Sequence, residues 1–473
     1  MTDFTADFTL TIDGRAATTA SLLPVRNPAT DRIFAEAPDG GQAELDAAVA
    51  AARRAFPGWA ATPIEERRAA LKRVAGVISA NLQDLARLLT QEQGKPFADA
   101  CGDIGGTAYW AMATADLEIP SEEADGPYGR VVTRYVPLGV VGAIVPWNFP
   151  TVLAMFKIGP ALLTGNTMVV KPSPFTPLTT LKIGELLRGV LPDGVLNIVS
   201  GGDALGPLMT AHPDIDKISF TGSTATGKRV MASAAATMKR ITLELGGNDA
   251  AIVLPDVDVA AVTEKLFWAA FRNSGQICVA TKRIYIHEDV YDELSAALAD
   301  YARTVSVGDG LEQGVRMGPV QNRAQFDRVR DLIDDAKANG LRFLAGGEVD
   351  ETRPGYFIPV TLIDNPPEDA RVVQEEAFGP VLPLLKYRDL DDVIARANAS
   401  PFGLGGTVWG RDVAAAQGVA ERLETGSVMI NGATAPSPLA PFAGHKQSGL
   451  GAEGGRDGLL AYTNPKTITV AKG

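Results

Sequence analysis

The chain has 473 residues, of which 46% are hydrophobic and 21% are charged, and its formal net charge is −12 at pH 7. This composition is typical of a globular protein with two large domains, and the acidic balance excludes a general nucleic-acid surface. The 2 cysteines cannot form a disulfide framework, so we expect a cytoplasmic protein. The histidines lack metal-ligand spacing and the apolar runs are too short to span a membrane, so we expect neither a metal site nor a membrane partner.

The N-terminal segment combines short strands, helices and a polar excursion. Alternating residues and turn residues predict short strands within 1–35, and apolar positions at helical spacing predict helices from Gln42 to about Leu89. Pro57 and Pro63 should interrupt these helices. Residues 118–137 are polar, and their second half alternates like an exposed strand, which predicts an excursion from the main body.

From Gly139 onward, apolar strands alternate with helices. The strands are predicted at 140–145, 167–171, 195–199, 217–220 and 241–245, with helices at 149–163, 177–190, 203–211 and 223–236 between them. This rhythm predicts a parallel sheet with helices on both faces. A second α/β segment follows from Asp256 to about Thr425. The tail 461–470 alternates again and should pair with the 118–137 segment or with a partner chain.

A cysteine and a glutamate stand in segments suited to covalent catalysis. Cys278 lies in the polar segment Asn273-Ser-Gly-Gln-Ile-Cys-Val279, and Glu244 ends an apolar run in Thr242-Leu-Glu-Leu-Gly-Gly-Asn248. A thiol nucleophile and a carboxylate that activates water are the parts of a covalent mechanism. A free cysteine is often simply buried, and we interpret Cys101 in that way. The polar surroundings of Cys278 favour a nucleophile whose pKa is lowered by backbone N–H groups or helix N-termini.

Other strand ends of the parallel sheet carry residues suited to a nucleotide and an oxyanion. The segment Gly222-Ser-Thr-Ala-Thr-Gly227 follows a strand and opens a helix, where free N–H groups could bind phosphate. It departs from the pattern G-x-G-x-x-G, so an ordinary capped helix is the alternative. Lys171, at another strand end, could bind ribose hydroxyls or simply be solvated. Asn148, held between two prolines, could donate to an oxyanion or cap the next helix.

Taken in chain order, these motifs resemble the aldehyde dehydrogenase superfamily of the hydrolytic, non-CoA-acylating type, and the resemblance covers essentially the whole chain. The motifs are Pro146-Trp-Asn-Phe-Pro150, Lys171-Pro-Ser-Pro-Phe-Thr-Pro177, Phe220-Thr-Gly-Ser-Thr224, Glu244-Leu-Gly-Gly247, Gly275-Gln-Ile-Cys278, Glu375-Glu-Ala-Phe-Gly-Pro380 and Pro441-Phe-Ala-Gly-His-Lys-Gln-Ser-Gly449. The resemblance implies an α/β fold with a Rossmann-like parallel-sheet cofactor domain (1–117 and 138–246) and an α/β catalytic domain (247–447). It also implies a small β oligomerisation arm (118–137 and 448–473), and therefore a homodimer or homotetramer.

The resemblance implies a role for each catalytic residue. Cys278 would attack the aldehyde carbon to form a thiohemiacetal, and the Asn148 side chain and the Cys278 N–H would bind the oxyanion. Hydride transfer to the nicotinamide would leave a thioester, which Glu244-activated water would hydrolyse. Lys157 and Glu453 match positions linked to proton transfer from this base. A CoA-acylating sub-class typically lacks the glutamate, so Glu244 favours release of a carboxylic acid; a catalytically silent binding protein is the remote alternative.

The cofactor implied by the resemblance is NAD+, with NADP+ possible. Lys171 and Glu376 would hold the adenosine and nicotinamide riboses, respectively. The other residues expected to line the cofactor are Trp147, Ser173, Gly222, Ser223, Leu245 and Phe378. Many NAD-preferring relatives carry a glutamate three positions after the lysine, whereas this chain has Pro174 there. No carboxylate at this position would repel a 2′-phosphate.

The substrate tunnel is expected between the two domains. Relatives that act on succinate semialdehyde carry an arginine where this chain has Phe156, so apolar or aromatic aldehydes are favoured. The loop 433–442 would form the other wall. Arg272 keeps a carboxylate-bearing semialdehyde open as a substrate if it turns into the tunnel; it could also face elsewhere. The full set of tunnel residues is Phe149, Val152, Phe156, Arg272, Ile277 and Phe442.

Overall fold

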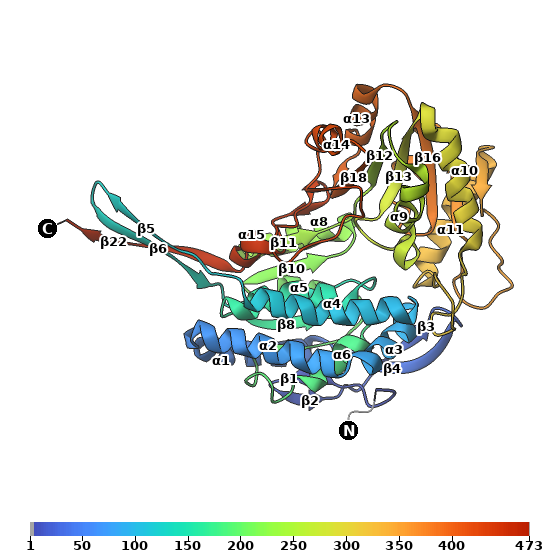
Figure 1. The fold of residues 1–473 in the computed structure, drawn as a ribbon. Coiled ribbons are helices and arrows are strands. Elements are labelled where there is room, and N and C mark those ends of the chain that lie inside the picture. The colour runs from blue at the N-terminus through green and yellow to red at the C-terminus, as the bar shows by residue number, and fades with distance from the viewer. Residues whose placement is uncertain (1–3, 473) are drawn as a thin grey trace.

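The computed structural model describes residues 4–472, which form two α/β domains and an arm that projects from them (Figure 1). The first domain is built on a sheet with the strand order β2-β1-β9-β8-β7-β10-β11-β21. Strands β7 to β11 pair in parallel, and β1, β2 and β21 pair antiparallel at the two edges. The strands are β1 (Leu10–Ile12), β2 (Arg15–Ala17), β7 (Val140–Ile144), β8 (Thr167–Lys171), β9 (Leu196–Ile198), β10 (Lys217–Thr221), β11 (Arg240–Glu244) and β21 (Gly449–Leu450).

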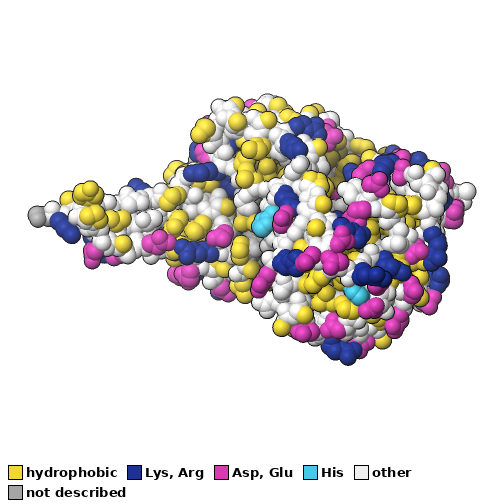
Figure 2. Space-filling view, turned by 90° about the horizontal axis from the view of Figure 1, so that it is seen from above, with side chains coloured by type: hydrophobic (Ala, Val, Ile, Leu, Met, Phe, Trp, Pro, Cys, Tyr) yellow, Lys and Arg dark blue, Asp and Glu magenta, His cyan; other side chains and the backbone are white. Residues whose placement is uncertain are grey.

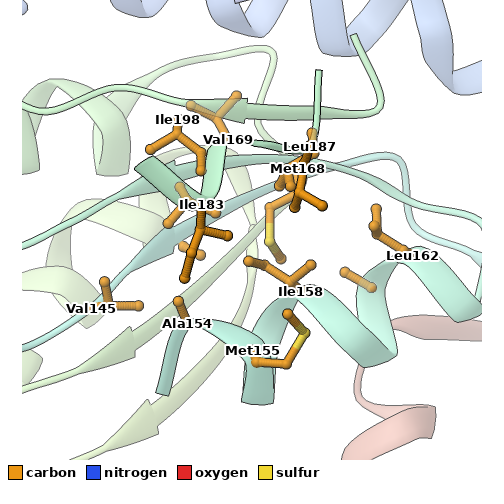
Figure 3. Packing of buried hydrophobic residues seen from close by; sticks show 14 of the residues in the cluster. Val145, Ala154, Met155, Ile158, Leu162, Met168, Val169, Ile183, Leu187 and Ile198 are labelled. Carbon is orange, nitrogen blue, oxygen red and sulfur yellow. The ribbon is translucent and has the colours of Figure 1, made fainter. Parts of the chain in front are cut away.

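Helices pack on this sheet in two groups because its strands are buried along their length. Helices α5 and α6 contact the sheet and each other, with α2, α3 and α4 outside them, whereas α1, α7 and α8 form the second group. Figure 3 shows Ile158 of α5 and Ile183 of α6 beside Met168 and Val169 of β8. The helices are α1 (Gln42–Ala61), α2 (Ile64–Ala80), α3 (Leu82–Gln93), α4 (Phe97–Ala115), α5 (Pro150–Leu163), α6 (Leu178–Leu186), α7 (Leu205–Ala211), α8 (Thr224–Ala234) and the short η1 (Ala235–Thr237).

The second domain has a sheet with the order β14-β15-β16-β13-β12-β18-β19, parallel except for the β14–β15 pair. Ala250 and Ile252 of β12 belong to one core cluster with α11, α13 and α14, whereas Ala251 and Val253 belong to another with α9 and α10. Successive strand residues point to opposite faces, so both faces are covered by helices. The elements are β12 (Asp249–Val253), α9 (Val259–Phe271), η2 (Arg272–Gly275), β13 (Thr281–His287), α10 (Glu288–Thr304), α11 (Arg323–Ala338), β14 (Arg342–Ala345), β15 (Thr361–Asp364), α12 (Arg371–Gln374), β16 (Val381–Tyr387), α13 (Leu390–Asn398), β18 (Gly405–Trp409), α14 (Val413–Ala420) and β19 (Ser427–Ile430).

The arm is an antiparallel sheet with the order β22-β6-β5, formed by β5 (Ser121–Gly126), β6 (Gly129–Pro137) and β22 (Thr463–Ala471). Strand β22 pairs with β6 from Thr463 opposite Pro137 to Ala471 opposite Gly129. This pairing confirms that the tail joins the polar excursion. Figure 2 shows hydrophobic and charged side chains interspersed along the projecting arm. Two hairpin-like pairs complete the fold, β3 (Leu22–Asn27) with β4 (Arg32–Pro38) and β17 (Phe402–Gly403) with β20 (His445–Lys446).

Two details differ from the predictions. Pro57 lies inside α1, so the predicted break there is wrong; buried Trp59, whose Nε1 donates to Leu162 O at 3.1 Å, anchors the helix beyond the proline. Of the tail 448–473, only β22 enters the arm. Strand β21 extends the cofactor sheet beside β11, and α15 (Gly455–Leu460) contacts α5, because tertiary pairing at a sheet edge is not encoded in the local pattern. Within the described residues, no helix is long and apolar enough to cross a membrane.

Candidate active site

The cysteine predicted as the nucleophile follows a tight turn at the end of α9. Asn273, Ser274 and Gly275 have φ angles of 52°, 58° and 73°, all in the left-handed region, which costs non-glycine residues about 1–2 kcal/mol each. Side-chain hydrogen bonds hold this turn: Ser274 Oγ donates to Gly318 O at 2.8 Å, and Gln276 Nε2 donates to Asn273 O at 2.9 Å. The turn therefore presents Cys278 from a fixed loop rather than from a helix.

Asn148 is tied directly to this loop. Its side chain is 3% exposed, and Nδ2 donates to Gln276 O at 3.0 Å, two residues before the cysteine. Its own backbone carbonyl accepts hydrogen bonds from Asn273 Nδ2 at 3.2 Å and from Lys95 Nζ at 3.0 Å. The alternative that Asn148 caps α5 is wrong, because Phe149 occupies the N-cap and no side-chain cap bond forms. The second amide hydrogen of Asn148 can serve a ligand.

Lys95 is a site residue that the sequence did not reveal. Its Nζ forms a fully buried ion pair with Asp103 at 2.7 Å and lies 3.8 Å above the centre of the Phe149 ring. In the sequence, Lys95 only marks the end of a helix, and no local pattern links it to Asn148, which lies 53 residues later. Lys95 therefore braces the Asn148 segment from the side of α4.

Glu244 lies at the carboxyl end of β11 with an exposed fraction of 3%. Neither of its carboxylate oxygens has a hydrogen-bond partner within residues 4–472. Burial raises the pKa of this carboxyl well above its usual range, the nearby charge of Glu453 raises it further, and Lys157 lowers it. A buried carboxyl with free oxygens and a raised pKa is suited to exchange a proton with water near neutral pH.

The predicted proton-relay residues meet behind Glu244. Lys157 of α5 donates to the Glu453 carboxylate and, at 2.8 Å, to Thr221 Oγ1 at the end of β10. Ser219 Oγ donates to the same carboxylate at 3.3 Å. Lys157 and Glu453 are almost fully buried, so their ion pair is shielded from solvent. The fold thus brings together two residues that lie 296 positions apart in the sequence.

A cleft of 640 Å³ opens at the carboxyl edge of the cofactor sheet, and this size suits a small-molecule ligand. Ser223 is the N-cap of α8, and its Oγ accepts from Thr226 N at 3.3 Å, so both the capping prediction and the cleft position hold. Burial lowers the pKa of Lys171 to about 8, and the only hydrogen bond of its Nζ among the described residues goes to Pro172 O. The predicted cofactor residues that line the cleft are Trp147, Lys171, Ser173, Gly222 and Ser223.

The remaining predicted cofactor residues lie at the end of the cleft nearest the cysteine. Phe378 packs edge-to-face against Trp147, with 5.4 Å between ring centres. Glu376 accepts a hydrogen bond from Gly247 N at 3.1 Å, and Leu245 is buried next to α8. A helix N-terminus, a lysine and a carboxylate spaced along one cleft suit the phosphates and riboses of a dinucleotide.

The predicted tunnel residues surround the approach to the cysteine. Phe442 and Ile277 pack with Cys278 in one small apolar cluster. Arg272, Val152 and Phe156 lie in a row along one face of α4, where they meet Gly102, Gly106 and Trp110 respectively.

The α4 face has its own signal in the sequence. Gly102, Gly106 and Trp110 follow each other at four-residue spacing, which places them on one side of a helix. The rings of Trp110 and Phe156 stack with their centres 3.6 Å apart and planes inclined by 30°. Arg272 is exposed, and its guanidinium lies 3.9 Å from the position that a Cβ on Gly102 would take. Trp110 was not among the predicted site residues, although this spacing could have revealed it.

Comparison with known proteins identifies the family. A model of the aldehyde dehydrogenase family matches residues 15–468. The chain belongs to this family. It is 44% identical over 469 residues to a probable aldehyde dehydrogenase from a Pseudomonas species, covering 98% of this chain and 94% of the relative. It is 39% identical over 463 residues to the Escherichia coli K12 succinate-semialdehyde dehydrogenase [NADP(+)] GabD, covering 96% and 95%. The NAD+ complex of an aldehyde dehydrogenase from Bacillus cereus has a TM-score of 0.95 and 36% identity, covering 98% and 97% of the two chains.

These findings confirm the predicted family, the α/β fold and the enzyme class. The enzyme is an NAD(P)-dependent aldehyde dehydrogenase, and its cleft contains a helix N-terminus, Lys171 and Glu376 in an arrangement that fits NAD(P)+. Within residues 4–472, no group of three or more His, Cys, Asp or Glu side chains is arranged to hold a metal ion.

The electrostatic surroundings of Cys278 differ from the expectation. Burial raises the pKa of the thiol to about 12, and the carboxylates of Asp249, Glu376 and Glu244 raise it further, whereas the ammonium of Lys282 lowers it. The expected lowering by helix ends and backbone N–H groups is therefore wrong. Desolvation of the thiolate outweighs those dipoles because the fold packs apolar side chains around the sulfur.

Proposed function

We propose that the enzyme converts an aldehyde to its carboxylic acid through a covalent intermediate on Cys278. The thiolate forms a bond to the carbonyl carbon, and the oxyanion accepts hydrogen bonds from Asn148 Nδ2 and from the Cys278 N–H. The observation that supports this assignment best is the 3.0 Å hydrogen bond from Asn148 Nδ2 to Gln276 O, because it keeps the amide beside the nucleophile. NAD(P)+, when bound in the cleft, accepts the hydride that leaves the same carbon.

Glu244 completes the reaction in this proposal. Water attacks the resulting thioester, its proton passes to the Glu244 carboxylate, and the C–S bond breaks to release the acid and the thiolate. The free oxygens and the raised pKa of Glu244 support this role as a base. The Lys157–Glu453 pair then carries the proton away from Glu244, which is consistent with the electrostatic influence of both groups on this carboxyl.

The nucleophile is tested by replacing each cysteine in turn. Cys278→Ser should abolish aldehyde-dependent NAD(P)H formation, because a serine hydroxyl is a far weaker nucleophile near neutral pH. Cys101→Ser is the matched control, since Cys101 is the other free, partly buried cysteine and should leave activity unchanged. Activity that survives in Cys278→Ser would refute the assignment. Product analysis should give the free acid with or without added CoA; an acyl-CoA product would favour the CoA-acylating alternative.

For the substrate, we propose apolar or aromatic aldehydes. The stacked rings of Phe156 and Trp110 and the apolar packing of Phe442 and Ile277 around the cysteine support this class. The experiment is a panel of benzaldehyde, medium-chain aliphatic aldehydes and succinate semialdehyde, with kcat/KM measured from NAD(P)H absorbance. Benzaldehyde and the aliphatic aldehydes should give the higher values; a clear preference for succinate semialdehyde would refute the proposal.

A carboxylate-bearing semialdehyde is the second candidate substrate. Arg272 is exposed, has no ion-pair partner among residues 4–472, and shares the α4 face with Val152 and Phe156. Known relatives also include GabD and glutarate-semialdehyde dehydrogenases. If this candidate is correct, Arg272→Leu should reduce kcat/KM for succinate semialdehyde about 100-fold while benzaldehyde is unaffected. Equal effects on both substrates would exclude a role of Arg272 in binding a carboxylate.

We also propose that the arm joins copies of the chain into a homodimer or homotetramer in the cytoplasm. Tyr128 and Val470 on the arm are 82% and 62% exposed, and a small isolated sheet needs a covering partner for stability. Light scattering should give a mass of two or four chains, and Val470→Asp should shift it towards the monomer. A monomeric native enzyme would refute the proposed assembly.

A further inference from the structure

Lys282 lies at the start of β13, four residues after the reactive cysteine, and its side chain is 5% exposed. Its ammonium donates to the backbone carbonyls of Ile277 at 2.8 Å, Cys278 at 2.8 Å and Ala280 at 3.3 Å. These bonds account for all the hydrogens of an ammonium group. Lysine is rarely buried, because removing its charge from water is costly. The burial of this one is therefore compensated by carbonyls on both sides of the nucleophile.

The bond to Ile277 O acts on the proposed oxyanion donor. The Ile277 carbonyl and the Cys278 N–H belong to the same planar trans peptide, in which C=O and N–H point in opposite directions. A cation that holds the carbonyl thus fixes where the N–H points. It also polarises the amide, which makes the N–H a stronger hydrogen-bond donor. Lys282 contacts the side of this peptide away from the oxyanion and so acts through Cys278 without touching the substrate.

The same ammonium links the nucleophile to the cofactor cleft. Its Nζ lies 3.5 Å from Glu376 Oε1 and 5.9 Å from the centre of the Phe378 ring, two residues at the nicotinamide end of the cleft. Glu376 Oε1 also accepts from Gly247 N, close to the end of β11. The catalytic loop, the carboxylate and the strand end are thereby joined by one buried cation.

Charged groups from several elements surround the thiol. Glu244 from β11, Asp249 from β12 and Glu376 after α12 each disfavour the thiolate, whereas Lys282 from β13 favours it. Loss of the Lys282 charge would leave the carboxylates and the apolar packing unopposed by this cation.

We propose that Lys282 is a positioning residue that orients the Cys278 peptide for oxyanion binding, joins it to Glu376 and supplies positive charge in favour of the thiolate. This inference rests on the proposed role of Cys278 and extends it to a residue that no motif in the chain indicated.

The test uses Lys282→Met, which keeps the length of the side chain and removes its charge and donors, in a Cys101→Ser background. Alkylation of Cys278 by iodoacetamide should become about tenfold slower, and its pH profile should move upwards by about one unit. kcat should fall by about 30-fold or more, and the KM for NAD(P)+ should rise. Lys282→Arg restores the charge and should recover most of the alkylation rate.

Lys239→Met is the matched control. Lys239 is also buried, at 8% exposed, and its Nζ donates to His212 O, Ile215 O and Thr237 Oγ1, far from the cysteine in the fold. This variant should lose stability as Lys282→Met does, but it should alkylate and turn over like the native enzyme. The comparison separates a general loss of folding from the specific effect on the thiol.

The outcomes distinguish the two proposals. If Cys278→Ser is inactive but Lys282→Met alkylates and turns over at native rates, the inference about Lys282 alone is overturned. If Cys278→Ser remains active, the proposed function itself fails. Should Lys282→Met not fold by circular dichroism, Lys282→Gln, which retains donors without charge, carries the same alkylation test, and a native pH profile in that variant would remove the electrostatic role.

Discussion

Asn148→Ala removes the side chain that we propose to bind the oxyanion. In the structure, one hydrogen of Nδ2 is used by Gln276 O at 3.0 Å, which leaves one hydrogen for the substrate. Loss of a single oxyanion donor costs about 2.7–4 kcal/mol in the transition state, so kcat should fall about 100- to 1000-fold. The loss of the bond to Gln276 O should lower the free energy of unfolding by only about 1 kcal/mol, because Asn273 Nδ2 also approaches that carbonyl at 3.4 Å.

The assay measures kcat and KM from NAD(P)H absorbance, the Kd of NAD(P)H from its fluorescence, and the melting temperature. The Kd should stay within about threefold of the native value, because Asn148 does not line the cofactor cleft. A reduced kcat with an intact Kd would place the defect in the chemical step.

Asn197→Ala is the control for the loss of a buried asparagine. Asn197 is fully buried in β9, and its Nδ2 donates to Met168 O and Gly194 O while its Oδ1 accepts from Asp13 N. It loses more hydrogen bonds than Asn148→Ala, so it should lower the melting temperature more while retaining its kcat. A native kcat in Asn148→Ala, or an equal loss of kcat in both variants, would refute the oxyanion assignment.

Three further predictions concern the base, the coenzyme and stability. Glu244→Gln should give a burst of about one NAD(P)H per active site followed by slow turnover, because the thioester forms but is not hydrolysed; rapid-mixing absorbance measures this, and turnover without a burst at the native rate would exclude Glu244 as the base. Initial rates should show NAD+ preferred over NADP+ with both accepted, and Pro174→Glu should lower kcat/KM for NADP+ about tenfold or more by repelling the 2′-phosphate; a strong native preference for NADP+ would contradict this expectation. Burial raises the pKa of Glu92 to about 7 although its carboxylate accepts from Leu178 N and Thr179 N, so the folded state binds this proton more tightly than the unfolded state. Stability should therefore fall as pH rises from about 4.5 to about 7, by up to about 3 kcal/mol, and Glu92→Gln should flatten this part of the melting-temperature profile; an unchanged profile would show that Glu92 is not the group responsible.

The architecture of the cofactor domain could be predicted because its signals are local. A strand buried on both faces is an uninterrupted apolar run, and parallel strands must be joined by helices, so the alternation after Gly139 implies the sheet directly. Since the carboxyl ends of such strands meet at one edge, Lys171, Gly222 and Glu244 were predicted as a group from their places at strand ends. The boundaries of these elements differ by a few residues at most from the predicted ones.

Details that depend on side-chain packing were not predictable in this way. The stack of Trp110 on Phe156 and the brace formed by Lys95 join α4 to segments far along the chain. The continuation of α1 through Pro57 depends on a tryptophan anchored to another helix. The direction of the Cys278 pKa shift is also a sum over surroundings, and burial by distant segments reverses the local expectation.

The sequence by itself determined the family, the parallel-sheet plan and the identities of the candidate nucleophile, base and amide donor, because these follow from residue types in short motifs. Only the tertiary structure decided how they act together. The Asn148 amide meets the cysteine loop across 128 residues, and Lys157 meets Glu453 across 296. Hydrogen bonds and charge interactions act over a few ångströms of space, so their partners are set by how the domains pack and not by distance along the chain.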